Sequence, residues 1–127
     1  LNIEGFQSDY FGKDCSIICF SHSSTIDAFV ITLAIPVRHY TLAKAELFLV
    51  PFFSWHLLAY GGIPIDRSNR DQAIEAIGIA AEAAGVGDTV AVSPEGTRST
   101  TGQIVAFKKG PFHLWESLKT PIIPLVI

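Results

Sequence analysis

The sequence has no methionine, only two cysteines and no excess of basic residues. Its formal net charge of −3 leaves no broad basic surface, which argues against a nucleic-acid partner held through its phosphates. Because the chain lacks methionine, begins at Leu1 and stops inside the apolar run IIPLVI, we expect residues 1–127 to be a segment of a longer protein. The absence of a signal peptide therefore says little about where that protein resides.

The two cysteines, Cys15 and Cys19, are four residues apart in a predicted strand. At about 3.3 Å per residue they would lie roughly 13 Å apart on one face, which is too far for a disulfide. The pair also lacks a nearby histidine at a spacing typical of zinc sites, so we expect no metal site. We interpret both residues as small core side chains in a reducing compartment.

The overall composition is that of a folded domain. With 127 residues, 49% hydrophobic and 17% charged, the chain can bury a substantial core as one domain, and disorder is excluded. No internal repeat or low-complexity tract interrupts it.

Apolar runs separated by turn residues predict strands alternating with helices. The expected strands cover 15–21, 37–43, 61–65, 88–93 and the run from 121 onward. The expected helices run from a cap at Ser23 or Ser24 to Pro36, over 45–60 with an interruption near Pro51, from a cap at Asn69 to Ala84, and from Pro111 to Lys119. This alternation predicts an α/β domain, a layered and largely parallel sheet flanked by helices.

The helix over 69–84 has the clearest pattern, with its outer face marked by Arg70, Glu75 and Glu82. Its expected buried face consists of Ala73, Ile74, Ile77, Ala80, Ala81 and Ala84.

The stretch from Leu47 to Ile65 has no formal charge over nineteen residues, enough to cross a bilayer by length alone. Proline and glycine interrupt it, however, and no basic cluster flanks it closely. We therefore expect this aromatic-rich segment to pack in the core or line an apolar cavity, with contact to a membrane surface as the alternative.

His22 follows the first predicted strand, at the end of the sheet where open α/β folds place their sites. Five residues of regular helix would turn Asp27 roughly 140° away from it, so the two can meet only if His22 lies in a loop and Asp27 in the first helical turn. The alternative is structural, because Ser24-Thr25-Ile26-Asp27 also matches a capping pattern in which the acidic residue reaches back to the cap.

Two further loops follow predicted strands. In SPEGTRS, Pro94 and Gly96 suit a simple turn, but Arg98 could also hold a phosphate or carboxylate through two donors. In GGIPIDRSN, Arg67 precedes a helix amino terminus, where phosphate binds readily; the alternative is a solvated arginine paired with Asp66.

These stretches together resemble the glycerolipid acyltransferase family, the 1-acylglycerol-3-phosphate acyltransferases and their relatives, whose domain carries four ordered blocks. HSSTID resembles the first block, GGIPIDR the second, SPEGTRS the third and TPIIPLVI the fourth, and FKKGPFHL is also typical of the family. The resemblance spans about Cys15 to Ile127. It implies one acyltransferase catalytic domain over 1–127 from a membrane-associated protein, at the endoplasmic reticulum in a eukaryote or the inner membrane in a bacterium.

The resemblance also implies a reaction: a fatty acyl group passes from acyl-CoA, or acyl carrier protein, to the free hydroxyl of lysophosphatidic acid, giving phosphatidic acid. The donor is a co-substrate, and no bound cofactor is expected. The alcohol needs a base, and His22 is expected in that role with Asp27 orienting its ring. The other implied residues are the phosphate and glycerol contacts Arg67, Glu95, Gly96, Thr97 and Arg98, and Pro124 near the acyl chain.

Some assignments stay open. The apolar stretch from Leu47 to Leu58 could form part of an acyl-chain tunnel. Lys108 and Lys109 either support an anionic substrate or form a solvated face. The remaining histidines, which have no matched acidic partners in the sequence, are interpreted as structural: His39, His56 and His113.

Two residues depart from the family pattern. Ser21 stands where many relatives have asparagine, and Pro64 where a bulky residue is more common; neither change removes a charge, but both blur the choice of acceptor. The alternatives are an acyltransferase acting on another lysophospholipid or on glycerol-3-phosphate, and a lipid-binding domain without catalysis. A serine hydrolase is disfavoured, because the sequence has no GxSxG elbow.

Overall fold

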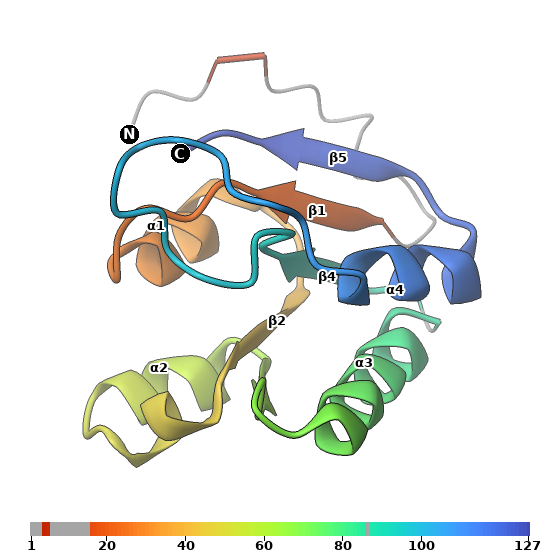
Figure 1. Ribbon diagram of the computed structural model, residues 1–127, viewed down its shortest axis with the longest axis horizontal. Coiled ribbons are helices and arrows are strands. Elements are labelled where there is room, and N and C mark those ends of the chain that lie inside the picture. The colour runs from red at the N-terminus through yellow and green to blue at the C-terminus, as the bar shows by residue number, and fades with distance from the viewer. Residues whose placement is uncertain (1–3, 6–15, 86) are drawn as a thin grey trace.

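The computed structural model describes residues 4–5, 16–85 and 87–127. Cys15 lies outside these ranges, whereas Cys19 is a partly buried free thiol. The elements within them follow the predicted alternation, in the order β1 (Ile17–Phe20), α1 (Asp27–Ala34), β2 (His39–Lys44), the 3-10 helix η2 (Ala45–Leu49), α2 (Phe53–Ala59), β3 (Gly62–Ile65), α3 (Arg70–Ala84), β4 (Thr89–Val92), α4 (Gly110–Leu118) and β5 (Ile122–Leu125) (Figure 1).

The strands form one sheet in the order β3-β2-β4-β1-β5, and every pairing among them is parallel. This confirms the predicted α/β architecture. Because all five strands point the same way, their carboxyl ends meet at one edge of the sheet, which we call the carboxyl edge. The connections that leave it are 21–26, 45–52, 66–69 and 93–109, followed by the terminal residues 126–127.

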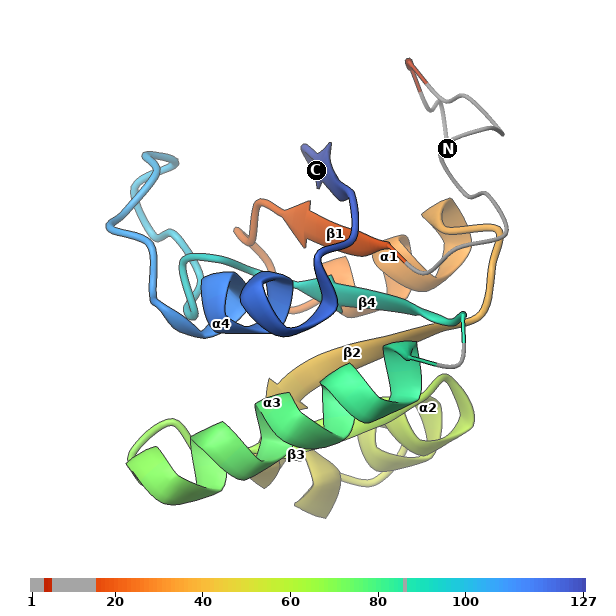
Figure 2. The same cartoon turned by 90° about the vertical axis from the view of Figure 1, so that its right-hand side faces the viewer.

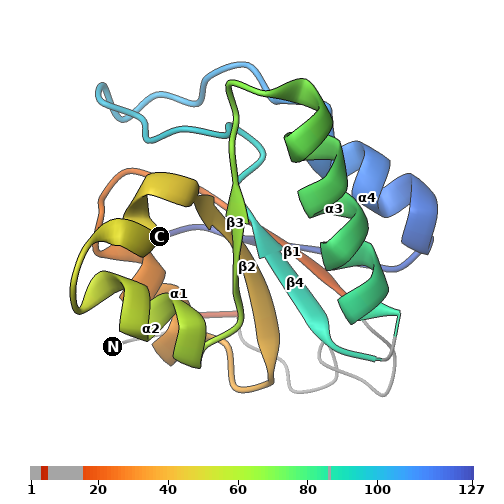
Figure 3. The ribbon, with the colours of Figure 1, turned by 90° about the horizontal axis from the view of Figure 1, so that it is seen from below.

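Helices cover both faces of the sheet. Figure 3 shows α1 and α2 on one side of the strands and α3 and α4 on the other, and Figure 2 shows α3 and α4 side by side. Alternate residues of the central strands belong to two separate hydrophobic cores, one on each face of the sheet, since successive side chains of a strand point to opposite faces. In β1, Ile17 packs toward the helices α3 and α4, whereas Ile18 and Phe20 pack with Ile31 of α1.

The start of α3 was predicted correctly and the start of α1 was not. Asn69 caps α3, because its side-chain oxygen accepts hydrogen bonds from the backbone N–H of Asp71 at 3.0 Å and of Gln72 at 3.3 Å. In α1, by contrast, the N-cap position is Ile26 and no side chain caps the helix. The backbone at Ser23 and Ser24 instead donates to the carboxylate of Asp27, which delays the first helical turn.

The predicted buried face of α3 also needs correction. Ile74 is 56% exposed, and the fully buried stripe is Ala76, Ala80 and Ala84, spaced four residues apart. Ile77 is only half-buried and lies toward α4, where a Cβ added to Gly110 would come within 3.1 Å of its Cδ1 atom. The small alanines let α3 lie close to the sheet, so the larger isoleucines point sideways or outward.

The segment from Leu47 to Ile65 does not lie mainly in the core. It forms part of η2, then α2 and β3, and within 47–60 only Leu57 is buried, while Leu49, Phe52 and Trp55 are largely exposed. The expectation of core burial was therefore wrong for most of its large side chains. The last turn of α2 does line a cavity of about 630 Å³, with the end of α1, at the amino end of β2. In the described part of the chain, no helix is long and apolar enough to cross a bilayer.

Candidate active site

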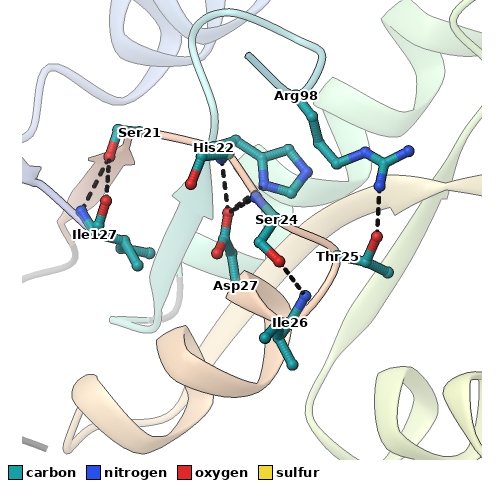
Figure 4. A network of polar contacts seen from close by, with 9 residues as sticks. Ser21, His22, Ser24, Thr25, Ile26, Asp27, Arg98 and Ile127 are labelled. Atoms are coloured by element: carbon teal, nitrogen blue, oxygen red, sulfur yellow. Dashed lines mark hydrogen bonds and ion pairs between the residues drawn. The ribbon is translucent and has the colours of Figure 1, made fainter. Parts of the chain in front are cut away.

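His22 and Asp27 meet at the carboxyl edge. His22 lies two residues beyond β1, and Asp27 is the first residue of α1. A turn at Thr25 and Ile26 folds the chain back, so that Nδ1 of His22 lies 2.8 Å from Oδ2 of Asp27 (Figure 4). The geometric condition inferred from the sequence, with the histidine in a loop and the aspartate in the first helical turn, is met.

The carboxylate of Asp27 is held from several sides. Its Oδ2 atom also accepts the backbone N–H groups of Ser23 and Ser24, each at 2.8 Å. Burial alone would raise the pKa of Asp27, but the hydrogen bonds from Ser24, His22 and Ser23 together bring that pKa below its ordinary value of 3.8. Asp27 is only 3% exposed, so a fixed, ionised carboxylate faces the imidazole.

This contact determines how the imidazole of His22 can act. When Nδ1 donates its proton to Asp27, the neutral ring has its lone pair on Nε2, which can then accept a proton. The ring also packs edge-on against Phe20, with centroids 5.9 Å apart, and its side chain is 23% exposed. The imidazole is thus fixed in orientation and tautomer while part of it stays open to solvent.

The loop after β4 begins with the predicted turn. The N–H of Gly96 donates to the carbonyl of Ser93 at 3.1 Å, with Pro94 and Glu95 between them. Glu95 is 3% exposed, and its Oε2 atom accepts the backbone N–H of Val105 at 3.0 Å. Its carboxylate therefore links the start of this loop to a residue ten positions farther along it.

Direct hydrogen bonds join this loop to the loop that carries His22. The N–H of Ser99 donates to the carbonyl of His22 at 2.7 Å. The guanidinium of Arg98 donates to the hydroxyl of Thr25 (Figure 4). The first and third sequence blocks are therefore in contact, and Arg98 and Thr25 are 73 positions apart in the chain.

The loop after β3 also contacts the loop after β4. The guanidinium of Arg67 donates to the carbonyl of Gly96. Asp66 instead accepts the N–H and the hydroxyl of Ser68, at 2.8 and 2.6 Å. The alternative interpretation of Arg67 as a partner of Asp66 is therefore wrong, and Arg67 instead binds the loop that carries Arg98.

A family model described as Acyltransferase matches residues 4–127. The chain belongs to the acyltransferase family. Among curated relatives of this family, the chain is 37% identical to a 1-acyl-sn-glycerol-3-phosphate acyltransferase of Cocos nucifera, over 100% of this chain and 41% of the relative. It is 34% identical to the enzyme of that name from Saccharomyces cerevisiae, over 100% of this chain and 43% of the relative.

A solved acyltransferase structure has the same fold. It is the 1-acyl-sn-glycerophosphate (LPA) acyltransferase PlsC from Thermotoga maritima, which matches with a TM-score of 0.67 and 25% sequence identity over 89% of this chain and 43% of that one. The chain spans less than half the length of each of these proteins.

The remaining predicted residues of this acyltransferase domain have no hydrogen bond or ion pair with His22 among the described contacts. Thr97 is exposed in the loop after β4. Pro124 is exposed on the edge strand β5, opposite Cys19, and so shares the face of the sheet covered by α3 and α4. Lys108 is exposed, and its side chain passes so near Gly96 that an added Cβ there would lie 2.9 Å from its Cγ atom.

The other histidines are engaged in contacts within the fold. The ring of His39 is hydrogen-bonded to the carbonyl of Val37 at 3.1 Å, and His56 to the hydroxyl of Thr32 at 3.2 Å. His113 does have an acidic neighbour, since its Nδ1 atom lies 3.7 Å from Oε2 of Glu116, and this corrects the expectation of no partner. That pair is exposed on α4.

Sequence reasoning missed two hydroxyl groups near the site. Thr25 is the partner of Arg98, and its only signal was its place inside the block HSSTID. Ser93 has a buried hydroxyl with no hydrogen-bond partner among the described residues, and nothing in the sequence indicated this. The described residues also contain no group of three or more His, Cys, Asp or Glu side chains placed to hold a metal ion.

Proposed function

We propose that this domain catalyses the transfer of a fatty acyl group from a thioester donor to the free hydroxyl of 1-acyl-sn-glycerol-3-phosphate. The observation that carries the proposal is the contact of 2.8 Å between Nδ1 of His22 and the buried carboxylate of Asp27. The names of the relatives support the same acceptor.

In the proposed reaction, Nε2 of His22 takes the proton of the acceptor hydroxyl as its oxygen attacks the thioester carbon. Asp27 stabilises the imidazolium that forms, through the hydrogen bond at Nδ1. A carbon–oxygen bond forms, the carbon–sulfur bond breaks, and the proton on His22 passes to the departing thiolate. A thioester already has a good leaving group, so the step needs no covalent enzyme intermediate and no metal ion.

The phosphate of the acceptor is proposed to bind between Arg67 and Arg98. Both guanidinium groups are anchored to loop atoms, Arg67 to the Gly96 carbonyl and Arg98 to the Thr25 hydroxyl, and each of these bonds uses one of five N–H donors. Arginine binds phosphate through paired, charge-assisted hydrogen bonds. The arrangement would hold the glycerol hydroxyls near the loop that carries His22.

The donor is proposed to be acyl-CoA, with acyl carrier protein as the alternative. The acyl chain is proposed to run along α1 toward the cavity at its far end. A second, much smaller space of about 10 Å³ is lined by Ala28, Thr32 and His56 among others. The two spaces share Thr32 and Tyr60 in their walls, so an acyl chain on this path would have to widen the smaller one.

The proposal is tested by replacing His22 in the full protein. His22→Ala should abolish the release of free thiol from oleoyl-CoA in the presence of lysophosphatidic acid, while the circular dichroism spectrum stays that of the unmodified protein. Retained turnover would show that His22 is not the base. A panel of lysolipids and glycerol-3-phosphate with labelled oleoyl-CoA would identify the acceptor, and a domain that binds lipid without catalysis would give no product with any of them.

A further inference from the structure

The hydroxyl of Ser21 joins the end of β1 to the residues that follow β5. The parallel pairing of β1 with β5 ends at Phe20 and Leu125. One further backbone bond follows, from the N–H of Ser21 to the carbonyl of Leu125 at 3.1 Å. The next bond uses a side chain, because the N–H of Ile127 donates to Oγ of Ser21 at 2.9 Å (Figure 4).

This last bond replaces one that a regular parallel ladder would contain. In such a ladder, the N–H and the carbonyl of one residue bond to two residues of the neighbouring strand that are two positions apart. Because the N–H of Ser21 bonds to Leu125, the regular donor to its carbonyl would be Ile127. The hydroxyl of Ser21 accepts that N–H instead. The side chain therefore completes the pairing at the point where β1 has ended and the loop that carries His22 begins.

His22 is the next residue, and its main chain is held from the other side. Its carbonyl accepts the N–H of Ser99, in the loop after β4, at 2.7 Å. Since β1 lies between β4 and β5 in the sheet, the two bonds tie the backbone at positions 21 and 22 in opposite directions. The contact of Nδ1 with Asp27 fixes the ring relative to the first turn of α1. The place of the ring above the sheet depends on the backbone from which it projects.

We propose that Ser21 is a positioning residue, whose hydroxyl fixes the backbone of His22 so that Nε2 meets the acceptor hydroxyl at the correct distance. Ser21 acts only through His22 and contacts no substrate in this role. Proton transfer requires the two heavy atoms to lie about 2.6–3.2 Å apart, and a misplacement of about 1 Å lowers a rate by about 10²-fold. The catalytic meaning of the inference rests on the proposed function, whereas the order of the imidazole is measurable without turnover.

Kinetics of three variants of the full protein test this role. Ser21→Ala removes the acceptor of the Ile127 N–H and should lower kcat by about ten- to hundredfold, with the acceptor KM within about twofold of its original value. Ser21→Thr keeps a hydroxyl at this position and should restore most of kcat. Ser117→Ala is the matched control and should leave kcat unchanged. It also removes a hydrogen bond between a serine hydroxyl and the backbone, the one to the His113 carbonyl at 3.1 Å on the exposed side of α4.

A double variant separates positioning from a general loss of stability. In Asp27→Asn the tautomer and orientation of the ring are no longer enforced, so adding Ser21→Ala should lower kcat by a smaller factor than it does in the unmodified protein. A structural effect that does not act through His22 would instead multiply the two losses. Urea denaturation of each variant shows whether it is fully folded at the assay temperature.

The Nδ1–H proton of His22 gives a readout that requires no catalysis. In the full protein labelled with nitrogen-15 histidine, its resonance is the one that Asp27→Asn shifts. Exchange of this proton with water should be about tenfold faster in Ser21→Ala than in the unmodified protein, because a loosened strand end opens the hydrogen bond more often. In Ser117→Ala the exchange rate should stay the same.

Several results would overturn the proposal. These are an unchanged kcat in Ser21→Ala, no recovery in Ser21→Thr, an equal loss in Ser117→Ala, or losses that multiply in the double variant. If the unmodified protein transfers no acyl group to any acceptor, the proposed function fails, and the exchange rate of the Nδ1–H proton alone decides the role of Ser21. An exchange rate that Ser21→Ala leaves unchanged then refutes it.

Discussion

The Oδ2 atom of Asp27 accepts hydrogen bonds from Nδ1 of His22 and from two backbone N–H groups, all at 2.8 Å. The amides of Ser23 and Ser24 fix the carboxylate, and the carboxylate in turn fixes the imidazole. A short loop between β1 and α1 thus contains the proposed base, the group that orients it and the donors that hold that group in place.

The first prediction concerns this carboxylate. Asp27→Asn should lower kcat of the proposed reaction by about 10²- to 10⁴-fold, because an amide neither stabilises the imidazolium nor enforces the Nδ1–H tautomer. The KM for the acceptor should change little. Initial rates with oleoyl-CoA measure both quantities. Asp88→Asn is the control, since Asp88 lies 3.6 Å from Arg38 at the other end of the sheet, and a comparable loss of kcat in that variant would contradict the assignment.

A second prediction follows from the lowered pKa of Asp27. A carboxyl whose pKa is lower in the folded than in the unfolded state binds fewer protons when folded, so it stabilises the fold above its unfolded value of about 3.8. That contribution is lost as the pH falls through the lower, folded pKa. Urea denaturation between neutral and acidic pH should show the free energy of unfolding falling more steeply below about pH 4 in the unmodified chain than in Asp27→Asn. Parallel curves for the two proteins would refute this.

The third prediction concerns the two arginines. Arg67→Ala and Arg98→Ala should each raise the KM for lysophosphatidic acid by roughly ten- to hundredfold, the expected effect of losing a hydrogen bond to a charged group. The KM for the donor should stay near its original value. Arg38→Ala is the control, because Arg38 is an exposed arginine at the amino end of β2. Acceptor kinetics that are unchanged in both site variants would exclude phosphate binding between them.

The fourth prediction compares two glycines with similar backbone angles. Gly96 has φ of +68° and Gly102 has φ of +72°, so alanine at either position should destabilise the fold by about 1 to 2 kcal/mol. Gly96→Ala should have the larger effect and should also raise the acceptor KM. Its Cβ would meet the side chain of Lys108 at 2.9 Å, whereas nothing lies within 4 Å of a Cβ at Gly102. Urea denaturation and acceptor titration measure the difference, and equal effects at the two positions would contradict it.

Local sequence rules predicted the elements of this protein well. Short apolar runs bounded by turn residues correctly placed all five strands, Asn69 was correctly identified as the cap of α3, and Pro94 with Gly96 correctly predicted the turn after β4. These features depend on residues within a few positions of one another. The spacing between His22 and Asp27 also belongs to this class, because the turn that joins them spans only five residues.

Tertiary structure decided the features that depend on distant segments. Composition showed that 47–60 is apolar, and periodicity placed Ile74 on the buried face of α3. Neither showed that Phe52, Trp55 and Ile74 would be exposed, since exposure depends on which other elements cover a helix. The contacts of Arg98 with Thr25 and of Arg67 with Gly96 join residues far apart in the chain.

By itself, then, the sequence determined the α/β alternation, the local turns and the residue types in each loop after a strand. Only the folded sheet decided that three of these loops touch. The physical reason is the parallel order β3-β2-β4-β1-β5, which brings the carboxyl ends of all the strands to a single edge. Sequence spacing within any one loop contains no information about that order.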